Sequence, residues 1–307
     1  MAELRFDGQV AVVTGAGGNP GLGRSYAKLL AERGAKVVVN DLGVGPDGHS
    51  AVQAKAEVVA QEIRDAGGEA IADTHSVAVQ EGAEAIIQSA LDAYGRIDIL
   101  INNAGVVDFK LFEDFESADM ARVLETHIQG ALYMCRAAWP HMKQAGYGRI
   151  VNTVSGAVLG ARYTSIYGTA KSAILGLTRN LAIEGEALGI KVNAIWPFAA
   201  TNAWTLMSAQ QAQPDEKVIQ AFSPDLVAPV VGFLAHEGNP GNGKCIVAEA
   251  NSIYELWFAR TTGAHVDALS LEAIERSWEK IVDRAQYSAY ADPYDGCAGF
   301  TLTPKGY

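Results

Sequence analysis

The sequence has few cysteines, and this scarcity limits the kinds of protein that it can encode. Only Cys135, Cys245 and Cys297 occur among 307 residues. They are far apart and odd in number, which argues against a disulfide framework and indicates a reducing compartment. No set of cysteines and histidines has the spacing of metal ligands, so we expect no metal site.

Long apolar runs and an excess of positive charge are also missing. No stretch reaches 18 apolar residues, and the start, Met1–Gly8, lacks the apolar core of a signal peptide. The net charge of -11 argues against nucleic acid and against an anionic membrane as partners. The C-terminal residues Lys305–Tyr307 carry no peroxisomal address, so a cytosolic location is expected.

The composition is that of a soluble globular enzyme, with 49% hydrophobic and 19% charged residues. Short apolar, β-branched runs alternate with helical patterns such as 51–65, 82–94 and 120–142. This alternation predicts an α/β fold, a Rossmann-like doubly wound parallel sheet of about seven strands with helices on both faces. The expected strands are 10–14, 37–40, 69–72, 97–101, 149–154, 191–196 and 245–248.

A glycine-rich turn follows the first expected strand. Gly15, Gly21 and Gly23 lie between that strand and a helical pattern, and Asp41 ends the second strand. Glycines let the backbone approach a pyrophosphate, and a helix N-terminus offers N–H groups to it. Because Asp41 can accept both ribose hydroxyls and would repel a 2′-phosphate, the pattern predicts NAD rather than NADP.

Tyr167 and Lys171 are spaced four residues apart, one turn along a helix. A phenol has a pKa of about 10, and a neighbouring ammonium favours its ionised form. Ser155, twelve residues upstream, can hold a substrate oxygen while Tyr167 transfers the proton. On its own this spacing is also compatible with a chance pair on a surface helix.

Taken together, these landmarks are similar to the short-chain dehydrogenase/reductase family over roughly residues 6–250. The resemblance is carried by Thr14-Gly15, Gly21-x-Gly23, Asp41, Asn102-Asn103-Ala104-Gly105, Asn152-x-x-Ser155, Tyr167-x-x-x-Lys171 and Asn193-Ala-Ile-x-Pro197. It implies that Tyr167 is the general acid or base, that Lys171 binds the nicotinamide ribose, and that Ser155 binds the reacting oxygen. The implied NAD contacts are Gly15, Asn19, Gly21, Leu22, Gly23, Asp41, Leu42, Ser76, Val77, Asn103, Ala104, Gly105, Tyr167, Lys171, Pro197, Ala200 and Thr201.

Within the family, the chain resembles the (3R)-hydroxyacyl-CoA dehydrogenase domains of the peroxisomal multifunctional enzymes of type 2. This resemblance implies NAD-dependent oxidation of a 3-hydroxyacyl-CoA. Alternative substrates are a hydroxysteroid and an aryl or other apolar secondary alcohol, and a catalytically silent nucleotide-binding protein is the alternative outside the enzymes. The segments that carry the resemblance are 22–27, 40–43, 139–142, 147–150, 181–185, 226–229 and 257–278.

Four departures from the family pattern stand out. The glycine loop is longer by two residues at Asn19-Pro20, and Ser155 to Tyr167 is one residue shorter than usual. His127 replaces an asparagine that anchors a water to the lysine, and it either keeps that role or only lines the core. His75 replaces an adenine-contacting aspartate, with adenine contact and a plain surface position both open.

The residues after the sixth expected strand form the predicted substrate side. Apolar side chains there favour a hydrophobic substrate, and packing alone is the alternative. The predicted substrate contacts are Ser155, Leu159, Tyr163, Phe198, Trp204 and Met207. For the phosphates of an acyl-CoA, only Arg162 and Lys110 are nearby basic candidates.

The chain is expected to consist of a catalytic domain over 1–250 and an extension over 251–307. The extension should hold an amphipathic helix at about 270–285, followed by a tail. Because enzymes of this family are usually dimers or tetramers, the resemblance implies a homodimer or a homotetramer.

Overall fold

The computed structural model describes residues 3–44, 55–201 and 216–289. The chain forms two compact units, Met1–Glu255 and Leu256–Tyr307. The first unit contains every residue that the sequence assigns to the site. We describe each unit by itself.

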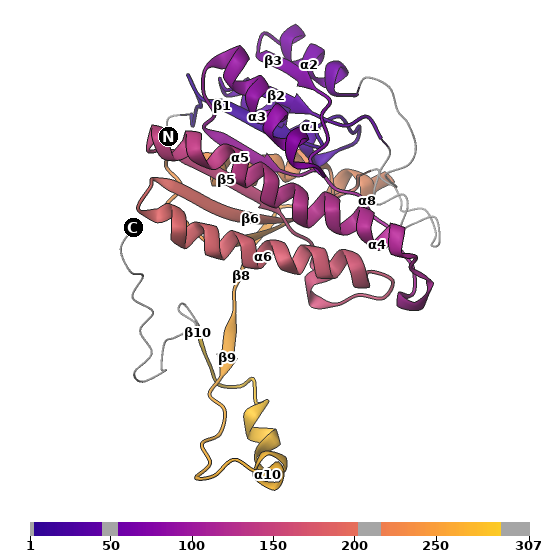
Figure 1. Cartoon of the computed structure of the whole chain (residues 1–307), viewed down its shortest axis with the longest axis vertical. Coiled ribbons are helices and arrows are strands. Elements are labelled where there is room, and N and C mark those ends of the chain that lie inside the picture. The colour runs from indigo at the N-terminus through magenta and orange to yellow at the C-terminus, as the bar shows by residue number, and fades with distance from the viewer. Residues whose placement is uncertain (1–2, 45–54, 202–215, 290–307) are drawn as a thin grey trace. The chain divides into compact units, whose positions relative to one another are not determined.

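The first unit is built on an eight-stranded sheet (Figure 1), whose strands from β3 to β7 are parallel. The α/β prediction is therefore confirmed. In spatial order the strands are β3 (Glu69–Asp73), β2 (Lys36–Asn40), β1 (Val10–Thr14), β4 (Ile99–Asn102), β5 (Gly148–Thr153), β6 (Ile190–Phe198), β7 (Cys245–Glu249) and β8 (Ser252–Leu256).

The eighth strand of this sheet was not predicted from the sequence. Two residues, Ala250 and Asn251, join β7 to β8, and so short a connection permits only antiparallel pairing. Residues 252–255 of β8 are exposed, so the strand lacks the continuous apolar run by which the buried strands were found.

The order of the strands reverses at β1, which lies between β2 and β4. The chain moves outward from β1 to β3 and then returns to the other side of β1. Such a switch point leaves a crevice beyond the carboxyl ends of the strands, where ligands bind in open α/β sheets. Thr14 and Asn102 end the two strands that flank this crevice.

Helices cover both faces of the sheet and bury two apolar cores. One core joins the sheet to α1 (Leu22–Glu32), α2 (Lys55–Asp65) and α9 (Ala228–Ala235). The other joins it to α3 (Gln80–Tyr94), α5 (Gly130–Ala145) and α6 (Ser165–Glu186), of which α5 and α6 run along the front of the sheet in Figure 1. None of the helices among the described residues has both the length and the apolar character needed to cross a membrane.

The helix predicted over 120–142 is interrupted in the structure. It consists of α4 (Ser117–Leu124), a π-helical turn (Glu125–Gln129) and α5. A π turn accommodates one extra residue within a helix, and such turns are frequent at functional sites. Here the turn carries His127. The shorter elements of this unit are α8 (Glu216–Ala221) and the 3-10 turns Phe112–Asp114, Gly156–Leu159 and Pro224–Leu226.

The second unit contains α10 (Leu271–Ile281) and an antiparallel pair of short strands, β9 (Ala259–Thr261) and β10 (Tyr287–Ala289). Ser270 caps α10 by accepting a hydrogen bond from the Ala273 amide. The predicted helix over 270–285 is thus present but shorter. Residues 290–307 of the predicted tail lie outside the described residues.

Truncating a side chain at the centre of the sheet should destabilise the first unit strongly. Ile101 in β4 is fully buried, so Ile101→Ala leaves a cavity and should lower the free energy of unfolding by about 2–5 kcal/mol. Ile253→Ala, at a position that is 63% exposed, is the matched control and should cost far less. Urea denaturation of both variants measures the difference, and equal losses would contradict the assignment of β4 to the core.

Candidate active site

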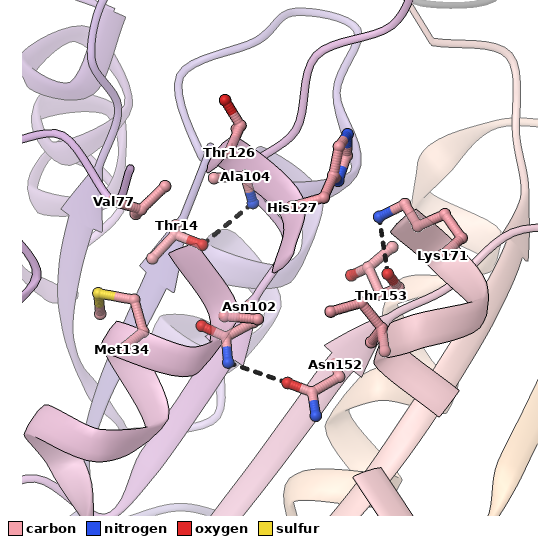
Figure 2. Close-up of a pocket in the computed structure, with 12 residues that line it drawn as sticks. Thr14, Val77, Asn102, Ala104, Thr126, His127, Met134, Asn152, Thr153 and Lys171 are labelled. Carbon is pink, nitrogen blue, oxygen red and sulfur yellow. Dashed lines mark hydrogen bonds between the residues drawn. The ribbon is translucent and has the colours of Figure 1, made fainter. Parts of the chain in front are cut away.

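The carboxyl ends of β1, β4 and β5 meet at a small cavity (Figure 2). Asn102 at the end of β4 donates a hydrogen bond to Asn152 on β5 at 2.9 Å, and Asn152 donates to the Thr178 hydroxyl at 3.0 Å. These amides close the inner wall of the cavity. Its lining residues are Thr14, Val77, Asn102, Ala104, Thr126, His127, Ala131, Met134, Asn152, Thr153, Lys171 and Ile174.

Lys171 extends from α6 to the mouth of this cavity. Its Nζ donates a hydrogen bond to the Thr153 carbonyl at 2.7 Å and lies 5.7 Å from the centre of the Tyr167 ring. The side chain is 4% exposed, and burial lowers the pKa of its amine from 10.5 to about 7. The predicted pair therefore lies on one helix, with the lysine close to the midpoint of its titration at neutral pH.

The electrostatics of Tyr167 differ from the sequence-based expectation. Burial raises the pKa of the phenol above its ordinary value, and a hydrogen bond with the Ser155 hydroxyl opposes that rise. The net shift of the phenol pKa is therefore upward, and its lowering by Lys171 stays a prediction for the enzyme with NAD bound. The physical reason is that the same burial that disfavours the phenolate also disfavours the ammonium that was expected to stabilise it.

Ser155 follows β5 and caps the 3-10 turn Gly156–Leu159 by accepting a hydrogen bond from the Ala157 amide at 3.3 Å. The close approach of Trp196 leaves no room for a side chain at Gly156, because a Cβ there would lie 2.6 Å from the indole ring. Ser155 acts on the pKa of the Tyr167 phenol, so the shortened segment still keeps the two side chains near each other.

His127 lies in the π turn and is 4% exposed. Its Nε2 is 2.7 Å from the Val106 carbonyl oxygen and 3.2 Å from the Val106 nitrogen, and its ring contacts Tyr167 edge to face at 5.3 Å. A Cβ on Gly105 would lie 2.4 Å from the imidazole, so the glycine makes room for the ring. His127 thus lies in the core and also lines the cavity, and its role in holding a water beside the lysine stays a prediction.

His127 is neutral at physiological pH. Burial lowers the pKa of its imidazole well below 6.5, the charge of Lys171 acts in the same direction, and the bond to Val106 opposes both.

The Thr14 hydroxyl joins the glycine turn to the end of β4. It accepts hydrogen bonds from the amides of Asn103 and Ala104, each at 3.0 Å. The Asn103 side chain donates in return to the carbonyls of Thr14 and Gly15 at 2.9 and 3.0 Å. The Asn103–Gly105 motif is therefore fastened directly to the predicted phosphate-binding turn.

The glycine turn is too crowded for side chains. A Cβ at Gly23 would lie 2.5 Å from the Gly15 carbonyl oxygen, and one at Gly21 would lie 2.5 Å from the Gly18 oxygen. Gly15 also has φ of +63°, which favours glycine. Gly21 caps α1 without a side-chain hydrogen bond, and no acidic residue occupies the first turn beyond it. The two extra residues, Asn19 and Pro20, lie in this same turn.

Asp41 follows β2 and closes the same edge of the sheet. Its two carboxylate oxygens accept hydrogen bonds from the amides of Gly17 and Gly43, each at 2.8 Å. The neighbouring Leu42 side chain is 52% exposed. The carboxylate therefore sits directly against the glycine turn, as a ribose ligand would require.

The remaining predicted cofactor contacts lie after β3 and at the end of β6. The Ser76 hydroxyl accepts a hydrogen bond from the Ala78 amide, and Val77 is buried against the cavity. Pro197 lies within β6, and the Ala200 amide donates to the Phe222 carbonyl at 2.7 Å. Thr201 is half-buried.

Comparisons with known proteins support this geometry. A family model described as short chain dehydrogenase matches residues 9–213. The chain belongs to the short-chain dehydrogenase/reductase family.

Two relatives are peroxisomal multifunctional enzymes type 2. The enzyme of Drosophila melanogaster is 40% identical over 92% of this chain, and that of Mus musculus is 41% identical over 92%. The matches cover 47% and 38% of these relatives, so the chain spans about half of their length or less. A solved short chain dehydrogenase from Mycobacterium avium is 33% identical with a TM-score of 0.77, covering 91% of this chain and 98% of that one.

Membership in the short-chain dehydrogenase/reductase family makes the protein an oxidoreductase that acts on CH–OH groups, in a family that uses NAD(P). The expectation of a cytosolic location is wrong. Both multifunctional relatives are named as peroxisomal enzymes, as are relatives from Dictyostelium discoideum, Neurospora crassa and Saccharomyces cerevisiae. Localisation signals are read by receptors and do not alter a fold. The absence of one recognisable tripeptide was therefore too weak a basis for predicting a cytosolic location.

The predicted substrate residues are only partly described. Leu159 and Phe198 are 69% and 42% exposed, and the Phe198 ring contacts Phe222 edge to face at 5.0 Å. Tyr163 has φ of +68°, which is uncommon for a bulky side chain, and the Arg162 guanidinium lies 5.1 Å from its ring. Trp204 and Met207 lie outside the described residues.

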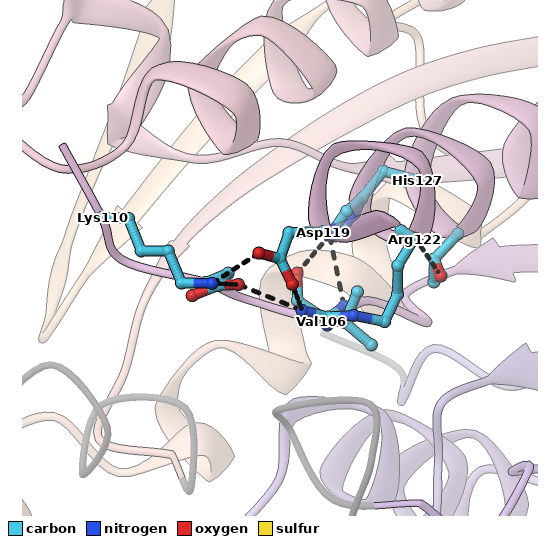
Figure 3. Close-up of polar contacts among 7 residues, drawn as sticks. Val106, Lys110, Asp119, Arg122 and His127 are labelled. Atoms are coloured by element: carbon cyan, nitrogen blue, oxygen red, sulfur yellow. Dashed lines mark hydrogen bonds and ion pairs between the residues drawn. The ribbon is translucent and has the colours of Figure 1, made fainter. Parts of the chain in front are cut away.

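Lys110 is paired with two carboxylates. Its Nζ lies 3.1 Å from the Asp108 carboxylate and 2.5 Å from that of Asp119, and Arg122 contacts the same Asp108 oxygen at 3.1 Å. Figure 3 shows this four-charge cluster, to which α4 contributes Asp119 and Arg122 and the loop that carries Val106, the partner of His127, contributes the other two charges. The two carboxylates balance the two cations, which weakens Lys110 as a phosphate ligand.

Sequence reasoning missed the roles of Thr14 and Thr153. The Thr14 hydroxyl organises the end of β4, and the Thr153 carbonyl receives the Lys171 amine. Thr14 was visible in the family motif, whereas a backbone carbonyl gives no sequence signal. Among the described residues, no group of three or more His, Cys, Asp or Glu side chains is placed to hold a metal ion.

The buried Lys171 should make the stability of the protein depend on pH. Its folded pKa of about 7 lies below the ordinary value of 10.5, so the unfolded chain binds more protons between these values. The contribution of Lys171 to the free energy of unfolding should therefore rise with pH in that window, by at most ~1.4 kcal/mol per pH unit. Below pH 7 its contribution stays constant at its most unfavourable value.

Urea denaturation of wild type and Lys171→Met between pH 7 and 9.5 measures this dependence. Subtracting the stability of the variant from that of wild type should leave a difference that rises with pH. Lys143→Met, at an exposed position on α5, should leave a flat difference. A flat difference for Lys171→Met as well would show that the amine is not desolvated.

Proposed function

We propose that the protein oxidises a secondary alcohol to a ketone with NAD, and that the alcohol is a 3-hydroxyacyl-CoA. The observation that carries this proposal is the meeting of Ser155, Tyr167 and Lys171 at the end of the sheet that also holds Asp41. The names of the multifunctional relatives support the acyl-CoA substrate. We assign the catalytic role to the first unit and the role of an extension to the second.

The residues of the first unit fit a dinucleotide. The glycine turn forms a backbone cradle that added Cβ atoms would fill, and the uncapped N-terminus of α1 opens onto it. Asp41 supplies an acceptor for ribose hydroxyls and a negative charge that repels a 2′-phosphate. Lys171, Asn103 and Pro197 are the residues that would hold the nicotinamide end.

NAD, when bound, would supply the acceptor for the hydride that leaves the carbinol carbon. Tyr167 removes the proton from the alcohol oxygen, and Ser155 holds that oxygen through a hydrogen bond. Lys171 helps this step when protonated, because a positive charge beside the ring favours the phenolate. Burial excludes water from the phenol, and the same burial raises the pKa of Tyr167.

An apolar secondary alcohol without CoA, such as a hydroxysteroid or an aryl alcohol, is the second candidate substrate. The neutralised Lys110 favours it, because one of the two nearby cations that could bind CoA phosphates is already paired with carboxylates. The exposed side chains of Leu159 and Phe198 suit either substrate. We further propose that the enzyme is a homodimer or a homotetramer, as its family membership suggests.

Turnover on a substrate panel tests the function. The purified protein should reduce NAD when a 3-hydroxyacyl-CoA is the substrate, and NADH absorbance measures the rate. Under the second candidate, hydroxysteroids or aryl alcohols should support this reduction instead. Tyr167→Phe keeps the ring that packs on His127 but loses the acid–base hydroxyl, so kcat should fall by about 10²- to 10⁴-fold.

Tyr254→Phe removes a hydroxyl from β8 and is the matched control, which should retain wild-type turnover. Full activity of Tyr167→Phe on the best substrate would disprove the mechanism. Tight NAD binding without turnover on any alcohol would instead favour a silent nucleotide-binding protein.

Removing the charge of Asp41 should weaken the preference for NAD. Asp41→Asn retains a hydrogen-bond acceptor but no longer repels a 2′-phosphate. The ratio of kcat/KM for NAD over NADP should fall by about 10- to 100-fold, because only the unfavourable interaction with NADP is lost. Asp65→Asn, at an exposed position at the end of α2, should leave the ratio unchanged. A wild-type preference for NADP would rule out the proposed cofactor.

A further inference from the structure

The Nε2 atom of His127 faces two groups of one residue and can form a hydrogen bond with only one of them. The Val106 carbonyl oxygen lies 2.7 Å from Nε2, and the Val106 amide nitrogen lies 3.2 Å from it (Figure 3). A protonated Nε2 donates to the carbonyl, whereas an unprotonated Nε2 accepts from the amide. The position of Val106 therefore decides which nitrogen of the neutral ring carries the proton.

The shorter of the two contacts favours the tautomer with the proton on Nε2. A separation of 2.7 Å lies at the short end of the hydrogen-bond range, and one of 3.2 Å lies at its long end. The Nδ1 atom of His127 is then an acceptor, and it has no hydrogen-bond partner within the part of the chain that the structure describes. A small displacement of the loop would exchange the two contacts, so the tautomer depends on how firmly the loop is held.

Two ion pairs hold this loop on α4. Asp108, two residues after Val106, contacts Arg122 at 3.1 Å. Lys110 contacts Asp119 at 2.5 Å. Further contacts of 3.1 and 3.7 Å join the two pairs into one cluster. Because the loop and the helix each supply one charge of either sign, the contacts fix the loop at one position along α4.

The cluster is shielded from solvent over most of its surface. The side chains of Asp108, Asp119 and Arg122 are each 17% exposed, and that of Lys110 is 35% exposed. Salt screens partly buried charges less than surface charges, and removing one partner leaves a partly desolvated charge unpaired. Apolar side chains often match such pairs in stability, which points to a defined geometry as the contribution of the charges.

Arg122 also connects the cluster to the π turn that carries His127. Its carbonyl accepts a hydrogen bond from the Thr126 hydroxyl at 2.8 Å, and Thr126 lines the same cavity as His127. The side chain of Arg122 thus holds the loop while its backbone holds the turn. The loop and the turn meet where the imidazole contacts the loop.

Val106 also packs on the catalytic helix. It belongs to a small apolar core that includes Ile166 and Ala170 of α6, the residues directly before Tyr167 and Lys171. The imidazole that Val106 contacts lies edge to face with the Tyr167 ring at 5.3 Å. A displacement of the loop would therefore reach the phenol through the imidazole and through the apolar core.

We propose that Arg122 and Asp108 are positioning residues for the reaction. They hold the Val106 carbonyl at the distance that keeps the proton of His127 on Nε2 and its ring against Tyr167. This inference rests on the proposed function, because only a reaction at Tyr167 makes the position of the ring matter. Both residues act through the loop and the π turn rather than on the reacting atoms.

Nitrogen-15 NMR of the histidine rings tests the position of the proton without cofactor or substrate. Wild type should show His127 in the Nε2–H form, and Asp108→Asn and Arg122→Met should each show a mixture with the Nδ1–H form. Arg5→Met removes another arginine that pairs with two carboxylates, so it is the matched control and should leave the His127 signals unchanged. A wild-type ring with its proton on Nδ1, or unchanged signals in both cluster variants, would overturn the proposal.

Steady-state kinetics tests the consequence for the reaction. Asp108→Asn keeps the shape of its side chain, so the variant should fold even where Arg122→Met does not. Its kcat should fall by about 10- to 100-fold, the loss that a displacement of about 1 Å can cause, while its KM for NAD should stay close to that of wild type. The double variant should lose no more activity than the weaker of the two single variants, because both changes break the same pair. Arg5→Met should keep the wild-type kcat.

The outcomes separate this inference from the proposed function. If wild type oxidises no secondary alcohol, the proposed function fails, whereas the NMR signals still decide whether the pair sets the tautomer. If wild type is active but Asp108→Asn keeps its kcat, or if the two single losses add in the double variant, the function stands and the positioning role is wrong. A change in the KM for NAD with kcat retained would indicate a general loosening of the fold and would also overturn the proposal.

Discussion

The hydrogen bond from the Lys171 amine to the Thr153 carbonyl is the contact on which the site depends. It connects α6 to the end of β5 and fixes the lysine at the mouth of the cavity, with the Tyr167 ring nearby. Because the amine is buried there, its pKa falls to about 7, and the charge that favours a phenolate is only partly present at neutral pH. The same burial raises the pKa of the Tyr167 phenol and lowers that of the His127 imidazole, so it favours the uncharged form of both groups.

The edge of the sheet that is predicted to bind the cofactor depends on a different kind of constraint, which is the lack of space for side chains. The glycine turn folds so tightly that a Cβ at Gly21 would overlap the backbone of Gly18, and it approaches the end of β4 so closely that a Cβ at Gly15 would overlap the backbone of Ala104. Thr14 and Asn103 fasten the turn to β4 with hydrogen bonds in both directions. A rigid, side-chain-free cradle of this kind presents backbone N–H groups at fixed positions, and a phosphate group then needs no rearrangement of the protein to bind.

Much of this arrangement could be predicted from the sequence. The parallel sheet followed from apolar runs that alternate with helical patterns, because buried strands and amphipathic helices leave clear periodicities. Ser155, Tyr167, Lys171 and Asp41 were named from their spacing, and the structure places the first three together and Asp41 against the glycine turn. β8 was missed because Ser252 and Glu255 leave it only a short apolar run. The π turn at His127 was missed because one extra residue barely changes a helical periodicity over a short window.

The sequence by itself determined the order of the elements, the chemical types of the site residues and the family to which they belong. Only the tertiary structure decided the electrostatic state of those residues. Whether Lys171 is charged and whether the Tyr167 pKa is raised or lowered both depend on burial and on partners from distant parts of the chain. Lys110 makes the same point. Its charge is balanced by carboxylates, because electrostatic interactions act through space rather than along the sequence.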